Sequence, residues 1–385
     1  MSAPIIQGPI IQGWCPGALR PMLSGDGLFV RIRPRGGRLS ADQVAGIAAL
    51  STEHGNGLID LSARANLQLR GVTEQSYDAL MTGLQGLGLL DASAEAEARR
   101  NILVTPFWLN GDGAQEIAAG LALALAAKDA PDLPGKFGFA VDCGAVPVLG
   151  AASADIRIEQ GLSGLICRAD GAVKGEPVTR ATAVEAALRL AHWFVDSGGA
   201  SNGRGRMAEL LGGGQTKSSD DNFSAPTPGP YAFGYLVGLE FGQISAATLA
   251  GLGPMRLTPW RMVLLEGVED APDLPGLITR ADDPLLRVVA CTGAPGCPQG
   301  LQATRGLARG LAGHIPKGRL LHLSGCAKGC AMPKTAAITL VGQSAGFGLV
   351  PMGLAGDEPL QSGLTEAALL ADPALIIGGQ NAAYL

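Results

Sequence analysis

The chain contains an internal repeat, which restricts it to folds built from two related halves. Residues 37–46 (GRLSADQVAG) align with 242–251 (GQISAATLAG), and residues 61–72 (LSARANLQLRGV) align with 257–268 (LTPWRMVLLEGV). A weaker third match aligns RNILVT, which starts at Arg100, with RVVACT, which starts at Arg287. The preserved order of three matches argues against chance similarity between Ala/Gly-rich segments. We therefore expect two copies of one structural unit.

Each copy has the pattern of a strand, a helix and a second strand, followed by a larger α/β segment. A unit of this size suggests that the two copies join into one ferredoxin-like domain. The first copy is expected to contain strands at 28–33 and 59–70 and helices from Ser40 to about Leu50, at 74–87, at 114–128 and at 181–195.

We predict an α+β fold of two pseudo-symmetric halves, each a ferredoxin-like half-repeat followed by an α/β domain. A polar, Gly- and Ser-rich segment at 212–229 is typical of a linker between the halves. The expected boundaries are 1–92 for the first half-repeat with an N-terminal extension, 93–225 for the first α/β domain and linker, 226–280 for the second half-repeat, and 281–385 for a cysteine-containing domain.

Four of the seven cysteines form two pairs, Cys291-x5-Cys297 and Cys326-x3-Cys330. Both loops consist of small residues and turn formers, which let backbone N–H groups approach bound sulfur closely. Four converging thiolates are what a [4Fe–4S] cluster requires. A helix expected at about 300–313 would point its N-terminal dipole at them. Structural zinc is the alternative, although its cysteine pairs are usually two to four residues apart.

Composition excludes several classes of protein. With a net charge of −5 the chain has no basic excess for a nucleic-acid partner. The N-terminus lacks the basic and apolar regions of a signal peptide, and the longest apolar stretch, near 118–127, is too short to cross a bilayer. We expect a cytoplasmic protein with reduced cysteines rather than disulfides.

Polar and apolar residues alternate strictly over 59–70, which predicts a strand with one polar face. A solvated sheet face is the simplest explanation, but arginine, asparagine and glutamine have fixed multi-donor geometry that suits carboxylates. The first strand repeats the pattern. The polar positions are Asp60, Ser62, Arg64, Asn66, Gln68 and Arg70 on one strand and Arg31, Arg33 and Arg35 on the other.

Two further basic positions precede apolar runs. Arg100 and Asn101 come directly before an expected strand at 102–105, and Lys136 lies in the segment LPGKFGF. Each alone is as well explained by an ordinary surface charge.

Together these features resemble the siroheme-dependent sulfite and nitrite reductase superfamily, over nearly the whole chain. In that family such cysteine pairs hold a [4Fe–4S] cluster, which implies the same role for Cys291, Cys297, Cys326 and Cys330. The resemblance also implies α/β domains of the sulfite-reductase type. Arg64 matches the family's strand arginine, Arg100–Asn101 its Arg–Asn motif, and Lys136 the first lysine of its Lys-Phe-Lys motif.

The sequence departs from the reductase pattern at two glycines. Gly138 stands at the second lysine and Gly135 at the arginine that usually precedes the first. The reductases use this positive charge to bind and protonate an oxyanion, and losing one such group costs about 3 kcal/mol of transition-state stabilisation. Plain sulfite or nitrite reduction is therefore disfavoured.

Residues 14–34 and 321–331 closely resemble the precorrin-3B synthase branch of this superfamily. That family hydroxylates precorrin-3A at C20 with O2 and a reductant in aerobic cobalamin biosynthesis, and forms a γ-lactone. It is associated with a [4Fe–4S] cluster and a mononuclear non-haem iron. Met332 stands where a histidine is expected in relatives.

The ligands of a mononuclear iron are not visible in the sequence. The four histidines, His54, His192, His314 and His322, include no pair with metal-ligand spacing. His322 is nearest the cysteine pairs, but a core position is the simpler explanation. Cys15 is a ligand or reactive thiol, or else a buried structural cysteine, and Cys143 and Cys167 are expected to be structural.

Our leading hypothesis is an oxidoreductase that oxygenates precorrin-3A. Arg64, Arg100 and Lys136 would be catalytic, and Arg31, Arg33, Asn66, Gln68, Arg70 and Asn101 would bind the substrate. No dinucleotide fingerprint follows a strand, so NADH would act as an external donor either through a partner reductase or at a non-Rossmann site. The alternatives are a siroheme sulfite or nitrite reductase and a non-catalytic iron–sulfur electron-transfer protein.

Overall fold

The computed structural model describes residues 15–212 and 226–377. Trp14, at the start of the 14–34 motif, and most of the expected linker lie outside these ranges. The described chain divides into two compact units, which we treat separately. One unit contains residues 23–27 and 280–377, and the other contains residues 15–22 and 28–279.

Two antiparallel sheets correspond to the two ferredoxin-like copies. The first contains β1 (Met22–Ser24), β2 (Gly27–Ile32), β5 (Leu67–Val72), β4 (Leu58–Leu61) and β13 (Gln243–Ser245), in that order. The second contains β11 (Gly229–Tyr231), β12 (Gly234–Leu239), β15 (Met262–Glu266), β14 (Met255–Leu257) and β3 (Arg38–Leu39), with β16 (Leu277–Ile278) paired to β12.

Each copy gives one short strand to the sheet of the other. β13 from the second copy pairs with β4 of the first, and β3 from the first pairs with β14 of the second. This exchange joins the two copies into one hydrophobic core, which contains Ile32, Ile59 and Leu69 together with Val237 and Leu257.

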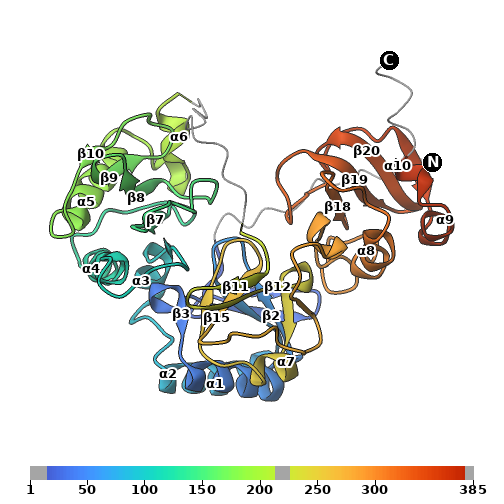
Figure 1. The fold of residues 1–385 in the computed structure, drawn as a ribbon, viewed down its shortest axis with the longest axis horizontal. Coiled ribbons are helices and arrows are strands. Elements are labelled where there is room, and N and C mark those ends of the chain that lie inside the picture. The colour runs from blue at the N-terminus through green and yellow to red at the C-terminus, as the bar shows by residue number, and fades with distance from the viewer. Residues whose placement is uncertain (1–14, 213–225, 378–385) are drawn as a thin grey trace. The chain divides into compact units, whose positions relative to one another are not determined.

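Three helices pack on the sheets of this joined domain, and local sequence explains where they begin. α1 (Ala41–His54) starts with a capping box between Ser40 and Gln43, and α2 (Glu74–Gly86) with one between Thr73 and Ser76. α7 (Ala246–Ala250) is capped by Ser245. The three helices lie side by side along one face of the joined sheets (Figure 1).

The α/β domains of the two copies have the same strand order. In the larger unit three parallel strands are followed by two antiparallel ones, and the smaller unit repeats this arrangement. The first set is β6 (Ile102–Val104), β7 (Phe139–Asp142), β8 (Ile156–Gly161), β9 (Gly164–Ala169) and β10 (Glu176–Pro177). The second set is β17 (Val288–Ala290), β18 (Leu321–Ser324), β19 (Ala336–Gln343), β20 (Gly346–Gly353) and β21 (Gln361–Leu364).

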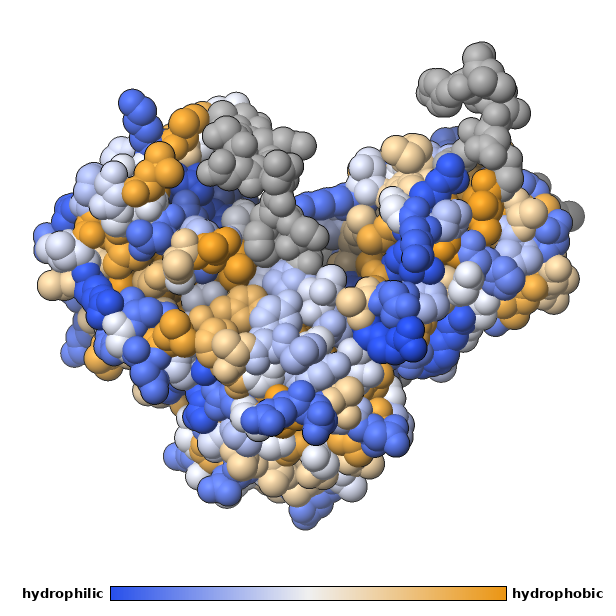
Figure 2. Space-filling model, in the orientation of Figure 1, coloured by the Kyte–Doolittle hydropathy of each residue, from blue (hydrophilic) through white to orange (hydrophobic). Residues whose placement is uncertain are grey.

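Helices cover these sheets in both units. The first domain carries α3 (Ala94–Arg99), α4 (Ala114–Ala126), α5 (Ala183–Asp196) and α6 (Met207–Leu210), and the second carries α8 (Arg305–Ala312), α9 (Glu366–Ala371) and α10 (Ala374–Ile377). The predicted α+β fold of two pseudo-symmetric halves is confirmed. On the face shown in Figure 2, hydrophobic and hydrophilic residues are interspersed, and no helix of the described chain is long and apolar enough to span a bilayer.

The expected single strand at 59–70 is wrong, because these residues form a hairpin of β4 and β5. The Ser62 hydroxyl accepts hydrogen bonds from the N–H groups of Arg64 and Asn66, and Ala65 has a left-handed φ of 53°. Asp60 and Gln68 are directly paired across the hairpin, so they share one face with Arg70. Arg64 lies at the turn instead of on that face.

The helix expected at 300–313 is also shorter than predicted. Thr304 precedes its first residue and α8 begins at Arg305. Residues 300–304 form a loop, since Leu301 donates its N–H to the carbonyl of Gly325 instead of entering a helix. The helix dipole therefore starts farther from Cys297 than the sequence suggested.

The exchanged strands bring together two ion pairs whose charges are swapped between the copies. In the first sheet Arg70 on β5 pairs with Asp60 on β4 at 3.5 Å, and Gln243 from β13 donates to Asp60 at 2.8 Å. In the second sheet Glu266 on β15 takes the acidic role. It pairs with Arg256 on β14 at 2.7 Å and with Arg38 from β3 at 2.7 Å.

Replacing Glu266 with glutamine should destabilise the protein by ~2–4 kcal/mol, because two guanidinium groups lose their charged partner. Burial raises the pKa of Glu266, but hydrogen bonds from Arg38 and Arg256 outweigh it and lower the pKa overall. The stabilisation is therefore present above the ordinary value of 4.5 and is lost as pH falls through the lowered pKa. Urea unfolding at pH 7 and at pH 3 measures both effects.

The matched control for this prediction is Glu185→Gln. Glu185 forms an exposed i,i+4 pair with Arg189, so its loss should cost no more than about 0.5 kcal/mol. Equal effects of the two substitutions would show that the exchanged strands do not depend on Glu266.

Candidate functional site

The two cysteine loops of the smaller unit lie at one edge of a sheet. Cys291 directly follows β17, and Cys326 follows β18 after one residue. These strands are adjacent and parallel, with Ala290 paired to Leu323. Because both strands end at the same edge, the loops that carry the two cysteine pairs meet there.

Glycine allows the two loops to touch through their backbones. A Cβ atom on Gly325 would lie 3.0 Å from the Cα of Gly293, and one on Gly300 would lie 2.6 Å from the N of Ala294. The Gly325 N–H donates to Cys291 Sγ at 3.1 Å. Backbone N–H groups directed at sulfur are typical of the surroundings of iron–sulfur clusters.

The four thiols are close enough to influence one another. Burial, followed by the charges of Cys291, Cys297 and Cys326, raises the pKa of Cys330 to about 11. Four thiolates this close repel each other unless a cation offsets their charge, and thiolate ligands suit iron–sulfur clusters. This donor set therefore fits a [4Fe–4S] cluster.

The described residues were also compared with the ligand sets that bind a single metal ion. Within residues 15–212 and 226–377, no group of three or more His, Cys, Asp or Glu side chains is placed to hold one metal ion. His322 is fully buried on β18, and His192 and His314 are exposed on the surface. The ligands of a mononuclear iron therefore remain unassigned.

A row of polar side chains crosses the first ferredoxin-like sheet of the larger unit. Arg31 on β2 is paired with Gln68 on β5, Gln68 with Asp60 on β4, and Asp60 with Gln243 on β13. Arg31 donates to Gln68 Oε1 through Nε at 3.0 Å and through Nη2 at 2.5 Å. Burial, followed by the charge of Arg33, lowers the pKa of Arg31 to about 10.

The hairpin turn brings Arg64 to the loop that contains Lys136. Arg64 Nη2 donates to the Lys136 carbonyl at 2.8 Å, while the Lys136 side chain is exposed. Burial is the largest cause of a lowered pKa for Arg64, and the Cys15 thiol acts against it. The structure thus places Arg64, Lys136 and Cys15 in one neighbourhood.

Arg100 is buried within the protein. It forms an ion pair with Asp91 at 2.7 Å and donates to the carbonyl of Arg33 at 2.8 Å. The Arg33 guanidinium is also buried, and it donates to the backbone carbonyls of Glu97 and Pro16. Both guanidinium groups are therefore engaged by protein partners.

A segment next to β2 is held down by the same residues. The Glu97 carboxylate accepts hydrogen bonds from the N–H groups of Ala18 and Leu19, and Tyr77 donates to the Ala18 carbonyl. These anchors fix the position of Cys15. Asn66, also predicted as a ligand, is buried in the hairpin turn, and Arg70 is buried in its pair with Asp60.

The loop from Gly135 to Gly138 packs closely against Asn101. Asn101 donates to the Phe137 carbonyl at 2.9 Å, and a Cβ atom on Gly138 would lie 2.7 Å from Asn101 Nδ2. At Gly135 a Cβ atom would lie 4.0 Å from that of Cys15, in ordinary contact. Asn101 therefore orients the loop and occupies the space beside Gly138.

Three supporting residues were missed from the sequence. Glu97 and Asp155 are buried acids, and Arg206 is paired with Asp155. Glu97 stands in an alternating AEAEAR segment typical of an exposed helix, so only its burial distinguishes it. Arg206, in the basic sequence SNGRGR, offered a charge signal that could have been noticed.

Substituting alanine for Gly300 should prevent cluster binding, because the new methyl group meets the backbone of Gly293 and Ala294. Iron and sulfide content per chain, with visible absorbance, measures the loss after reconstitution. Gly313→Ala is the control, since nothing lies within 4 Å of its Cβ position. The Cys330→Ser protein, which lacks one proposed cluster ligand, gives the iron content expected when cluster binding is lost. Full iron content in the Gly300→Ala protein would contradict the role given to this close approach.

Comparisons with known proteins agree with this architecture. A family model for the nitrite/sulfite reductase ferredoxin-like half domain matches residues 20–87. The structure of the Mycobacterium tuberculosis NirA protein shares the fold, with a TM-score of 0.57 and 19% identity over 89% of this chain and 79% of that one. A ferredoxin–nitrite reductase from Synechococcus elongatus is 25% identical over 84% of this chain and 77% of its own length.

A precorrin-3B synthase from Sinorhizobium sp is more similar than the nitrite reductase. It is 31% identical to this chain over 90% of this chain and 84% of its own length. The match covers both α/β domains and both ferredoxin-like copies. The chain therefore belongs to the precorrin-3B synthase family, and it is an oxidoreductase with a nitrite/sulfite reductase-like fold.

Proposed function

We propose that this chain hydroxylates precorrin-3A at C20 with O2, with formation of the γ-lactone of precorrin-3B, in cobalamin biosynthesis. The observation that carries the proposal is the 31% identity to a precorrin-3B synthase over 90% of the chain. In the balanced reaction one atom of O2 enters the product and the other leaves as water. An external reductant such as NADH supplies the two electrons, through a partner reductase.

The substrate is a flexible tetrapyrrole with many carboxylates, and the polar row offers matching donors. Arg31 and Gln68 lie half-buried on the sheet face. Arg64 and Lys136 add two cations at the hairpin turn. Partly desolvated guanidinium groups bind carboxylates strongly and with defined geometry. We assign substrate binding to these four residues and an orienting role to Asn101.

Arg33, Arg100, Asn66 and Arg70 are positioning residues in this proposal. Their polar groups are buried, and those of both Arg33 and Arg100 contact backbone carbonyls. They hold the Cys15 segment and the hairpin in place beneath the substrate-binding residues.

Cys291, Cys297, Cys326 and Cys330 would hold the [4Fe–4S] cluster, which supplies one-electron transfer when bound. Within residues 15–212 and 226–377 no ligand set fits a mononuclear non-haem iron, so we assign no step to one. The protein contributes thiolate ligands and the Gly325 N–H directed at Cys291.

A siroheme-dependent sulfite or nitrite reductase is the second candidate, favoured by the Synechococcus elongatus relative. Gly138 argues against it, because the chain lacks the second lysine of the reductase pattern. Siroheme has intense visible absorption bands, so their presence in the purified protein at one equivalent per chain would favour this candidate.

The proposal is tested by incubating the reconstituted protein with precorrin-3A and a reducing system, with and without O2. We expect a product one oxygen atom heavier than the substrate in air and unchanged substrate without O2. Arg64→Ala should lower kcat/KM by roughly tenfold or more, because a charged hydrogen bond to the substrate is lost. Glu185→Gln, at a surface pair, serves as the control. Unchanged precorrin-3A in air with a loaded cluster would contradict the proposal.

A further inference from the structure

Arg206 lies beside the loop that lacks the reductase lysine. Its Nε donates to Asp155 at 2.8 Å, and its Nη2 donates to Ser153 Oγ at 3.1 Å and to the Ala154 carbonyl at 3.3 Å. The side chain is 28% exposed. Within the described chain its Nη1 has no hydrogen bond, so this group is available to a ligand.

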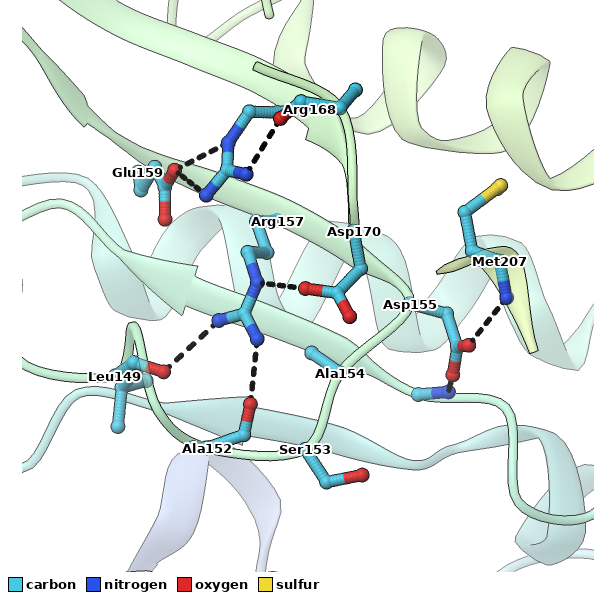
Figure 3. Close-up of polar contacts among 12 residues, drawn as sticks. Leu149, Ala152, Ser153, Ala154, Asp155, Arg157, Glu159, Arg168, Asp170 and Met207 are labelled. Atoms are coloured by element: carbon cyan, nitrogen blue, oxygen red, sulfur yellow. Dashed lines mark hydrogen bonds and ion pairs between the residues drawn. The ribbon is translucent and has the colours of Figure 1, made fainter. Parts of the chain in front are cut away.

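The Asp155 carboxylate joins Arg206 to Gly138. One oxygen accepts from Arg206 and from the backbone N–H of Met207 at 2.9 Å, and the other accepts from the Gly138 N–H at 2.9 Å. Figure 3 shows this carboxylate directed at the N–H of Met207, at the start of α6. Asp155 is 1% exposed, so the connection is sheltered from water.

Arg64 approaches the same loop through a different contact. It donates to the carbonyl of Lys136, two residues before Gly138. After burial and the opposing effect of Cys15, the charge of Arg206 also lowers the pKa of Arg64. Arg64 therefore contacts the 136–138 loop directly, and Arg206 is joined to it through Asp155.

We propose that Arg206 is a substrate-binding residue that forms, with Arg64, a two-guanidinium site for one carboxylate of the tetrapyrrole. In this site Arg206 replaces the cation that is absent at Gly138. The inference deepens the proposed function and rests on it, because it names the substrate group that binds beside the hairpin turn at Arg64.

The chemistry of Arg206 suits a carboxylate better than a small inorganic oxyanion. Asp155 offsets part of its charge, whereas an unpaired lysine at position 138 would contribute a full charge. Nη1 can donate two hydrogen bonds in the guanidinium plane, while Nε and Nη2 are held by protein partners. Holding Nε and Nη2 also fixes the direction of the remaining donor, which lowers the entropy cost of binding.

The test measures binding of uroporphyrin III, an octacarboxylate porphyrin, to the full-length protein. The change in porphyrin fluorescence on binding gives Kd. Arg206→Ala should raise Kd by about tenfold to a hundredfold, because a charged hydrogen bond to the ligand is lost. Arg206→Lys keeps the charge and a partner for Asp155 but loses the planar guanidinium that fixes the direction of Nη1, so binding should recover only in part. Arg204→Ala, at an exposed arginine two residues earlier, removes the same charge and should change Kd by no more than about twofold.

The outcomes separate this inference from the proposed function. If the unmodified protein binds the porphyrin and Arg206→Ala binds equally well, the inference is wrong and the proposed function stands. If the unmodified protein does not bind at all, both are contradicted. Circular dichroism and Tm establish whether the Arg206→Ala protein is folded, and the Arg206→Lys protein supplies the answer if it is not. Equal Kd values for the Arg206→Lys and unmodified proteins would also overturn the inference, since planarity would then be irrelevant.

Discussion

The exchange of short strands between the two ferredoxin-like copies is the constraint on which the polar face depends. β13 completes the sheet that carries Asp60, and β3 completes the sheet that carries Glu266. Each exchanged strand delivers a hydrogen-bonding partner, Gln243 or Arg38, to an acid in the other copy. Neither sheet is complete without the other copy, so the face that contains Gln68 is fixed by residues far away in sequence.

The two copies have diverged in complementary ways. Arg31 and Gln68 of the first sheet align with Leu236 and Leu264 of the second, so one face is polar and the other apolar. Arg64 at the first hairpin turn aligns with Trp260 at the second. Trp260 packs near Phe107, which stacks on Tyr231 with ring centroids 5.0 Å apart. Aromatic side chains fill the position at which the first copy presents a cation.

The cysteine loop shows the opposite distribution. Cys291 follows β17 in the second copy, whereas the aligned residue of the first copy is Val104, a buried residue of β6. One copy therefore carries the thiolates and the other carries the guanidinium face.

The sequence predicts the fold class, the repeat and the convergence of the two cysteine pairs, because these follow from local patterns and spacing. Alternation over 59–70 does not reveal the hairpin, since Asp60 pairs with Gln68 and the even-numbered residues of both strands share a face. The burial of Arg100 in its pair with Asp91 depends on tertiary packing that no local pattern encodes.

The site at the 136–138 loop shows the same limit. The absence of a lysine at Gly138 is visible in the sequence, but the arginine beside it comes from a segment almost seventy residues away and is held there by the buried Asp155. Charge alone would make Arg204 and Arg206 equal candidates for this site. Their different exposure in the folded chain separates them.

The central claim is that this fold, which also serves oxyanion reduction in its relatives, here directs electrons to oxygen chemistry on a carboxylated tetrapyrrole. The most direct measurement is the mass of the product formed from precorrin-3A under ¹⁸O2 in unlabelled water. The account predicts a hydroxyl oxygen that carries the heavy isotope. An unlabelled hydroxyl, derived from water, would contradict it.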